Sequence, residues 1–110
     1  MSKIGCDILR IKRIEDKLKN EKFLERFFSC EEIELFKQRK FNAQTVTGNF
    51  CAKEAYVKAL GCGFGTIRPK DIQVLRRKNG EPYLVHDGNE FAVSISHDGE
   101  YAFAVVILED

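Results

Sequence analysis

The spacing of hydrophobic and polar residues divides the chain into an early strand, a helical part and a strand-rich part. Residues 3–9 form a short, mostly apolar run, which predicts a buried strand although Asp7 lies within it. From residue 10 to residue 22, Ile11, Ile14 and Leu18 recur at intervals of three and four between charged residues. This pattern predicts an amphipathic helix with an exposed basic side.

Three further helices are predicted after residue 22. Residues 23–28 keep the helical spacing, and the run from Ser29 to Glu32 has the form of a capping box that starts the next helix. Two short helices are therefore expected to meet at Ser29. A longer helix is predicted for about residues 43–60, because its apolar residues fall on one stripe and Gly61 provides a natural end.

After Gly61 the hydrophobic period changes to two. Runs at residues 71–75, 82–85, 91–96 and 101–108 predict strands, and Asn-Gly or Asp-Gly pairs at 79–80, 87–88 and 98–99 separate them. Consecutive hairpins imply one antiparallel sheet, so the fold class is α+β with helices packed against that sheet. We assign the odd-numbered hydrophobic residues of 91–95 and 101–105 to one face. Ala102, Ala104 and Val106 then form a second apolar face that needs a cover.

Composition limits the classes of protein and partner. The 110 residues, 44% of them hydrophobic, suffice for one domain spanning residues 1–110. The 18 basic and 17 acidic residues give a net charge of +1, which removes the bulk electrostatic case for nucleic acid as a partner. The apolar runs are too short for a signal peptide or a membrane span, so a cytoplasmic protein without a membrane partner is expected. Four cysteines without C-x-x-C spacing are expected to be free thiols.

Two carboxylates are the first candidates for chemistry. Asp7 either caps the next helix or lies in a buried strand, where its charge needs a partner. On the long helix, Glu54 borders the apolar stripe and Lys58 follows one turn later, which fits a surface ion pair. Alternatively, if Asp7 faces Glu54, the two carboxylates form an oxygen-rich site suited to Mg²⁺, and Lys58 would meet a phosphate.

Other polar and glycine-rich segments give weaker signals. The glycines of residues 61–65 follow a helix, which fits a helix end and a turn, whereas the phosphate-binding signatures place glycines before a helix. His97 ends a strand, where it is either a turn residue or a phosphate contact. The two histidines of the chain supply no recognisable nucleophilic triad.

Five segments together resemble the holo-acyl-carrier-protein synthase family, the short trimeric type of 4′-phosphopantetheinyl transferase. They occur in the same order as in that family and span nearly the whole chain. The segments are Ile4-Gly-Cys-Asp-Ile8 with Arg13, Glu25-Arg-Phe-Phe-Ser29 with Glu32, Phe50-Cys-Ala-Lys-Glu-Ala55 running into Lys58-Ala-Leu-Gly-Cys-Gly63, Asn79-Gly-Glu-Pro82, and Ser94-Ile-Ser-His97.

The resemblance implies a homotrimeric, Mg²⁺-dependent enzyme of fatty acid biosynthesis. It would transfer 4′-phosphopantetheine from coenzyme A to a serine of apo acyl carrier protein and release adenosine 3′,5′-bisphosphate. Asp7 and Glu54 match the metal-binding carboxylates, and Lys58 would stabilise charge on the pyrophosphate. Either Glu54 or a carboxylate-held water would accept the serine proton.

The resemblance also assigns substrate contacts. Arg13, with Arg26 nearby, would meet the acidic carrier protein. The nucleotide contacts implied are Lys53, Lys58, Gly61, Gly63, Asn79, Gly80, Pro82 and His97.

One position departs from the family pattern. The family usually has an arginine that helps to hold a coenzyme A phosphate directly before Phe50, where this chain has Asn49. Either this chain lacks part of the family's contact with the nucleotide, or a nearby group such as Lys53 takes over that contact; the metal-binding pair is unaffected in both cases. A non-catalytic nucleotide binder or a carrier-protein adaptor would not need the carboxylate pair, so Asp7 and Glu54 discriminate between these classes.

Overall fold

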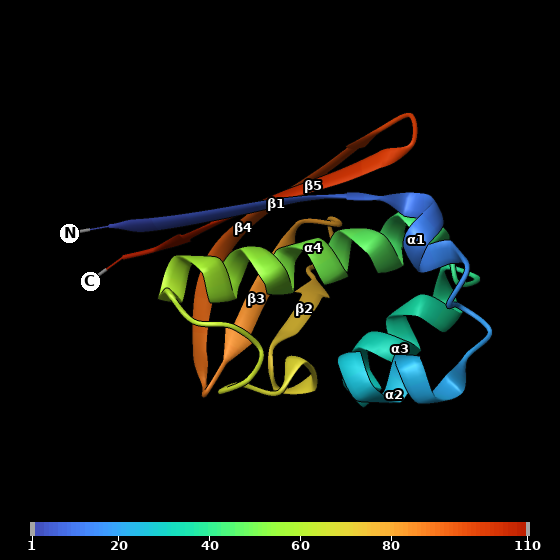
Figure 1. The fold of residues 1–110 in the computed structure, drawn as a ribbon, viewed down its shortest axis with the longest axis horizontal. Coiled ribbons are helices and arrows are strands. Elements are labelled where there is room, and N and C mark those ends of the chain that lie inside the picture. Colours follow the sequence, from blue (N-terminus) through green and yellow to red (C-terminus); the bar gives the residue numbers. More distant parts are fainter. Residues whose placement is uncertain (1, 110) are drawn as a thin grey trace.

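Helices cover one face of a five-stranded antiparallel sheet in the computed structural model, which describes residues 2–109 (Figure 1). The predicted α+β class is therefore confirmed. None of the helices within residues 2–109 has the length and apolarity needed to cross a membrane. The elements in chain order are β1 (Lys3–Arg10), α1 (Ile11–Glu15), α2 (Glu21–Phe27), α3 (Cys30–Gln38), α4 (Ala43–Leu60), the short 3₁₀ helix η1 (Pro69–Asp71), β2 (Gln73–Arg76), β3 (Pro82–His86), β4 (Asn89–Asp98) and β5 (Tyr101–Leu108).

The sheet has the strand order β1-β5-β4-β3-β2, so the first strand of the chain pairs with the last. Both described ends of the chain consequently lie on the same side of the molecule (Figure 1). The long strand β4 joins two parts of the sheet, because residues 89–91 pair with β3 and residues 92–98 pair with β5. The hairpins predicted from the turn residues are present.

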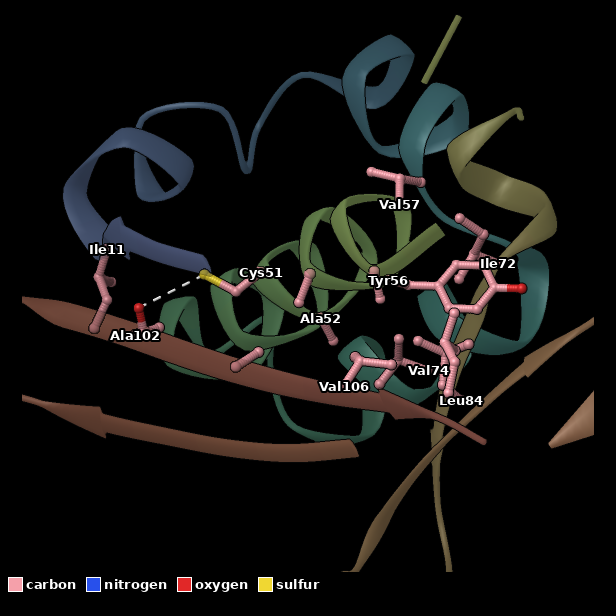
Figure 2. Close-up of a cluster of buried hydrophobic side chains, with 14 residues drawn as sticks. Ile11, Cys51, Ala52, Tyr56, Val57, Ile72, Val74, Leu84, Ala102 and Val106 are labelled. Carbon is pink, nitrogen blue, oxygen red and sulfur yellow. Dashed lines mark hydrogen bonds between the residues drawn. The ribbon is translucent and has the colours of Figure 1, made fainter. Parts of the chain in front are cut away.

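Helix α4 is the central element of the core. Its alanines Ala52, Ala55 and Ala59 pack in one cluster with Ala102 and Val106 of β5 (Figure 2). Small residues allow a close approach here. The opposite side of α4 packs on a second cluster built from α1, α2 and α3 and rich in phenylalanine. The predicted bounds of this helix are confirmed, and Gly61 ends it with a φ of +79°.

The close approach also involves Gly5 of β1. A Cβ atom at this position would lie 2.0 Å from the backbone oxygen of Ala55 and 2.7 Å from the backbone nitrogen of Ala59. Only glycine fits between the strand and the helix at this distance. Gly5 therefore fixes how near β1, which carries Asp7, lies to α4.

The predicted helix over residues 10–22 is wrong in its extent. The structure has the five-residue helix α1, then a turn, and α2 begins at Glu21. The side chain of Asn20 accepts a hydrogen bond from the backbone nitrogen of Phe23, which caps α2 and starts a new helix. The capping box of Ser29 and Glu32, by contrast, is present as predicted.

The predicted faces of β5 are also wrong. Ile95 of β4 pairs with Ala104, so the even-numbered residues of β5 face the helices together with the odd-numbered residues of β4. Tyr101 and Phe103 lie on the outer face instead, where both are partly exposed. An apolar outer face therefore exists, but its residues are Ile4, Ile8, Tyr101, Phe103 and Ile107.

Candidate active site

Asp7 and Lys58 form an ion pair between β1 and α4. Asp7 pairs with Ala104 in the sheet and so shares its helix-facing side. The ammonium Nζ of Lys58 lies 3.0 Å from Oδ1 of Asp7, and the side chains are 55% and 16% exposed, respectively. Asp7 does not cap α1, whose cap residue Arg10 makes no capping side-chain hydrogen bond. The carboxylate is held at the helix-facing edge of the sheet, with the flexible lysine above it.

Glu54 lies one turn before Lys58 and completes this polar group. Its side chain is half-buried, and burial together with the negative charge of Asp7 raises the pKa of its carboxyl, whereas Lys58 lowers it. The predicted Glu54–Lys58 ion pair is not among those of residues 2–109, because Lys58 pairs with Asp7. The structure thus brings the two predicted carboxylates and the predicted lysine together.

The donors of this group fit a hard divalent cation. Within residues 2–109, no group of three or more histidine, cysteine or acidic side chains is arranged to hold a metal ion. Two carboxylates leave the other positions of an octahedral shell to water and phosphate oxygens, which is the arrangement that Mg²⁺ favours. The nearby thiol of Cys51 does not compete, because burial raises its pKa to about 12 and its Sγ lies 3.6 Å from the backbone oxygen of Ala102 (Figure 2).

Some of the predicted nucleotide contacts meet at a second place. Gly80, Pro82 and His97 line a cavity of about 440 Å³ at the start of α4. Asn79 lies in the same turn, where its Oδ1 accepts a hydrogen bond from the backbone nitrogen of Glu81. The structure adds two residues that sequence reasoning missed, Arg39 and Arg76, which line this cavity too.

The predicted glycine contacts lie elsewhere. Gly61 caps the carboxyl end of α4, and its backbone nitrogen donates to the carbonyl oxygen of Lys58. Gly63 follows in an exposed turn. Gly61 therefore lies next to Lys58, and neither glycine lines the cavity that His97 lines.

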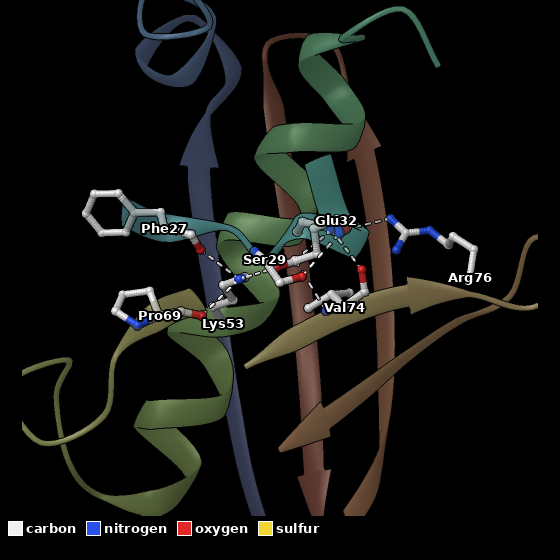
Figure 3. A network of polar contacts seen from close by, with 8 residues as sticks. Phe27, Ser29, Glu32, Lys53, Pro69, Val74 and Arg76 are labelled. Carbon is white, nitrogen blue, oxygen red and sulfur yellow. Dashed lines mark hydrogen bonds and ion pairs between the residues drawn. The ribbon is translucent and has the colours of Figure 1, made fainter. Parts of the chain in front are cut away.

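The predicted nucleotide contact of Lys53 is wrong. Its side chain is completely buried, and Nζ donates to the backbone oxygens of Phe27 and Pro69 at 2.7 and 2.9 Å. The third partner is Oε1 of Glu32 at 2.5 Å (Figure 3). Three acceptors use all three protons of the ammonium group. Lys53 therefore joins α4 to α2, α3 and η1, and it has no donor left for a nucleotide.

Glu32 and Asn49 extend this buried network. Oε2 of Glu32 accepts from Nδ2 of Asn49 at 3.0 Å and from the backbone nitrogen of Val74 at 3.3 Å. Burial raises the pKa of Glu32 and lowers that of Lys53, while their mutual attraction opposes both shifts. The network fixes the flank of α4 that faces away from Glu54, because positions 49 and 54 differ by about 140° around a helix.

Arg13 and Arg26 lie in one groove of about 460 Å³ between α1, α2 and α4. Phe23, Phe27 and Phe50 contribute apolar surface to it. Two further cations, Lys17 and Lys22, line the same groove. The two arginines proposed from the sequence as carrier-protein contacts thus lie together beside an apolar surface.

Comparisons with known proteins identify the family of this chain. A model of the 4′-phosphopantetheinyl transferase superfamily matches residues 3–106. A holo-[acyl-carrier-protein] synthase from Clostridium botulinum is 47% identical, with 96% of this chain and 95% of the relative covered. One from a Geobacillus species is 44% identical, with 96% and 94% covered.

Solved structures give the same result. The holo-[acyl-carrier-protein] synthase of Helicobacter pylori in complex with coenzyme A superposes with a TM-score of 0.83 at 37% identity, covering 94% of this chain and 96% of that chain. The Bacillus anthracis enzyme has a TM-score of 0.81 at 38% identity, with 96% and 93% covered. The chain therefore belongs to the 4′-phosphopantetheinyl transferase superfamily and, within it, to the holo-[acyl-carrier-protein] synthase family of enzymes, as the sequence motifs indicate.

Proposed function

We propose that this enzyme transfers 4′-phosphopantetheine from coenzyme A to a serine of apo acyl carrier protein. The observation that carries the proposal is the group of Asp7, Glu54 and Lys58, which combines two carboxylates with an ammonium at the edge of the sheet. The coenzyme A complexes of related enzymes support the choice of donor.

Asp7 and Glu54 would hold Mg²⁺, which neutralises charge on the pyrophosphate of coenzyme A when bound. Lys58 is 55% exposed and has a flexible stem, so its ammonium can move from Asp7 to a pyrophosphate oxygen. The serine oxygen of the carrier protein bonds to the β-phosphorus as the bond to the bridging oxygen breaks. Adenosine 3′,5′-bisphosphate leaves, and the serine proton passes to Glu54 or to a water that the carboxylates hold.

The groove that contains Arg13 and Arg26 would receive the carrier protein. Acyl carrier proteins are acidic, and the groove combines four cationic side chains with an apolar surface. Opposite charges accelerate encounter and set the orientation of the partners, whereas the apolar part adds contact area. Phe50 contributes to the groove, and Glu54 follows it by one turn of α4, which supports a docking surface beside the proposed reacting group.

The working enzyme is proposed to be a homotrimer with active sites between subunits. The outer face of β1 and β5 exposes large apolar side chains, among them Ile4, Ile8 and Phe103, which need a cover. Within one chain, the cavity of His97 lies along the Asn49 flank of α4 and the carboxylates lie on the other flank. Contact between subunits would bring the cavity of one chain beside the carboxylates of the next.

The cellular setting is proposed to be the cytoplasm, with a role in fatty acid biosynthesis. All four cysteines are free thiols, as the sequence predicted. Free thiols persist where glutathione and thioredoxin keep them reduced, which supports this location.

Incubation with coenzyme A, MgCl₂ and apo acyl carrier protein, followed by mass spectrometry of the carrier, tests the proposed reaction. The expected result is a mass increase equal to one 4′-phosphopantetheine group, which excess EDTA prevents. Replacement of the acceptor serine by alanine in the carrier protein is the matched control and abolishes the increase. A carrier of unchanged mass, with an enzyme that binds coenzyme A, would instead define a non-catalytic binder.

A further inference from the structure

The cavity at the start of α4 contains two guanidinium groups that no part of the reaction scheme uses. Arg39 follows α3 and Arg76 ends β2, so residues from different elements bring their charges to the same hollow. The rest of the lining is mostly polar, with Asn42, Gln44, Thr45 and His97 among its residues. No aspartate or glutamate lines this cavity.

Arg76 has only neutral partners. Its Nη2 donates to Oδ1 of Asn49 at 2.9 Å, and its Nη1 donates to the backbone oxygen of Leu75 at 3.3 Å. No carboxylate of residues 2–109 forms an ion pair with it, whereas the next residue, Arg77, pairs with both Glu81 and Glu90. Burial and the positive charge of Arg39 lower the pKa of Arg76 to about 10, so the group remains a cation at neutral pH.

Asn49 fixes the direction of this guanidinium. Its Nδ2 donates to Oε2 of Glu32 at 3.0 Å and to the backbone oxygen of Val74 at 2.9 Å, which uses both amide protons. Oδ1 must therefore point the other way, where it accepts from Arg76. Because Asn49 is completely buried, its own amide cannot reach a ligand in the cavity.

We propose that Arg76, positioned by Asn49 and assisted by Arg39, binds the terminal phosphate monoester of coenzyme A. The inference rests on the proposed function. If Asp7 and Glu54 of one subunit take the pyrophosphate, the ribose 3′-phosphate is the remaining anion for the cavity that the neighbouring subunit brings beside them. A phosphate monoester carries up to two negative charges, and a guanidinium can bond two of its oxygens at once.

Arg76 thus supplies the charge that neither Asn49 nor Lys53 can supply. Asn49 is neutral and Lys53 is enclosed in the interior. The guanidinium of Arg76, on β2, is held by the buried amide of Asn49, on α4. Its direction is therefore fixed before the ligand arrives, so little side-chain freedom is lost on binding. In this chain the phosphate contact depends on β2 and on the buried network behind it.

Calorimetric titration of Arg76→Gln with coenzyme A and with dephospho-coenzyme A tests this assignment. The dissociation constant for coenzyme A is expected to rise on the order of tenfold to a hundredfold, while that for dephospho-coenzyme A stays near the wild-type value. Arg77→Gln is the matched control, since it removes a neighbouring arginine that is already paired with Glu81 and Glu90. It should leave both dissociation constants unchanged.

Arg39→Gln provides a second variant that does not disturb the buried network, because Arg39 is exposed. It should also raise the dissociation constant for coenzyme A and not that for dephospho-coenzyme A, by a smaller factor than Arg76→Gln does. The assignment would be overturned if Arg76→Gln weakened the binding of both ligands equally. It would also be overturned if neither Arg76→Gln nor Arg39→Gln changed the affinity for either ligand. Transfer to the carrier protein is measured separately, so an enzyme that transfers normally but shows no 3′-phosphate selectivity would contradict only the role of Arg76.

Discussion

Two lysines on α4, five positions apart, show how much a single residue depends on its place around the helix. Lys53 is completely buried among three oxygen acceptors, whereas Lys58 is 55% exposed beside Asp7. Five positions turn a helix by about 140°, so one lysine enters the interior and the other reaches solvent. The sequence motif indicates that both lysines belong to the site, but the partners that enclose Lys53 come from other parts of the chain.

Glu32→Gln tests the buried pair at this scale. The substitution keeps the size of the side chain but leaves the ammonium of Lys53 without its counter-charge in the interior. The free energy of unfolding, measured by urea denaturation, is expected to fall by about 3–5 kcal/mol. Glu31→Gln, on the exposed side of the same helix turn, should have little effect.

The double variant Glu32→Gln with Lys53→Met checks the cause. Removal of the unpaired charge should recover part of the lost stability. A double variant less stable than Glu32→Gln alone would show that the hydrogen bonds of this network, including those from Lys53 to Phe27 and Pro69, outweigh the cost of the stranded ammonium.

Among the elements, the contact between β1 and α4 sets the distance between Asp7 and Glu54. A methyl group on Gly5 would collide with the backbone of α4 at Ala55 and Ala59, so strand and helix would have to separate. Gly5→Ala is expected to reduce stability by about 1–3 kcal/mol and to lower the transfer rate more than the affinity for the carrier protein.

Gly65→Ala is the control for this prediction, because a Cβ there has no neighbour within 4 Å. Thermal unfolding and steady-state kinetics give the two readouts. Wild-type stability and rate in Gly5→Ala would show that strand and helix can move apart without disturbing the carboxylates.

The basic groove between α1 and α2 gives a second prediction among the elements. Arg13→Glu should raise the Michaelis constant for the carrier protein far more than that for coenzyme A, because charge reversal opposes an acidic partner. Added salt should raise the Michaelis constant of the wild-type enzyme for the carrier protein strongly, and that of the variant less. Lys12→Glu reverses a charge on the same helix outside this groove. Equal effects of the two substitutions would place the docking surface elsewhere.

Local signals explain which elements could be predicted. The capping box of α3 and the glycine end of α4 lie within a few residues of what they determine, and both were predicted correctly. The helix over residues 10–22 was not, since Asn20 caps a new helix within an unbroken hydrophobic pattern. The faces of β5 depend on which residue of β4 each position pairs with, and alternation along one strand does not contain that register.

The same argument applies to the site. Asp7, Glu54 and Lys58 could be predicted from motifs, because each belongs to a short characteristic run. Arg39 and Arg76 could not be predicted in this way. They are separated by 36 residues in the sequence, and only folding brings them to one cavity. A surplus of arginine at the ends of elements is too common a signal to identify them.

For the whole molecule, the outer face of β1 and β5 predicts assembly. Phe103→Glu, opposite Ile8 in the sheet, should convert a trimer into monomers in analytical ultracentrifugation and abolish transfer. In the wild type, Cys6 on this face should resist alkylation by iodoacetamide, whereas Cys30, exposed on α3, should react. A monomeric wild type with full activity at micromolar concentration would contradict this prediction.

The most direct test is the transfer rate of Asp7→Asn and Glu54→Gln as a function of Mg²⁺ concentration. Each substitution removes one negative charge from the proposed cation site with little change in volume. With thermal unfolding near that of the wild type, both variants should transfer 4′-phosphopantetheine more than about a hundredfold more slowly at limiting Mg²⁺. A wild-type rate at limiting Mg²⁺ in either folded variant would contradict the assignment of Asp7 and Glu54 as the paired carboxylates of the active site.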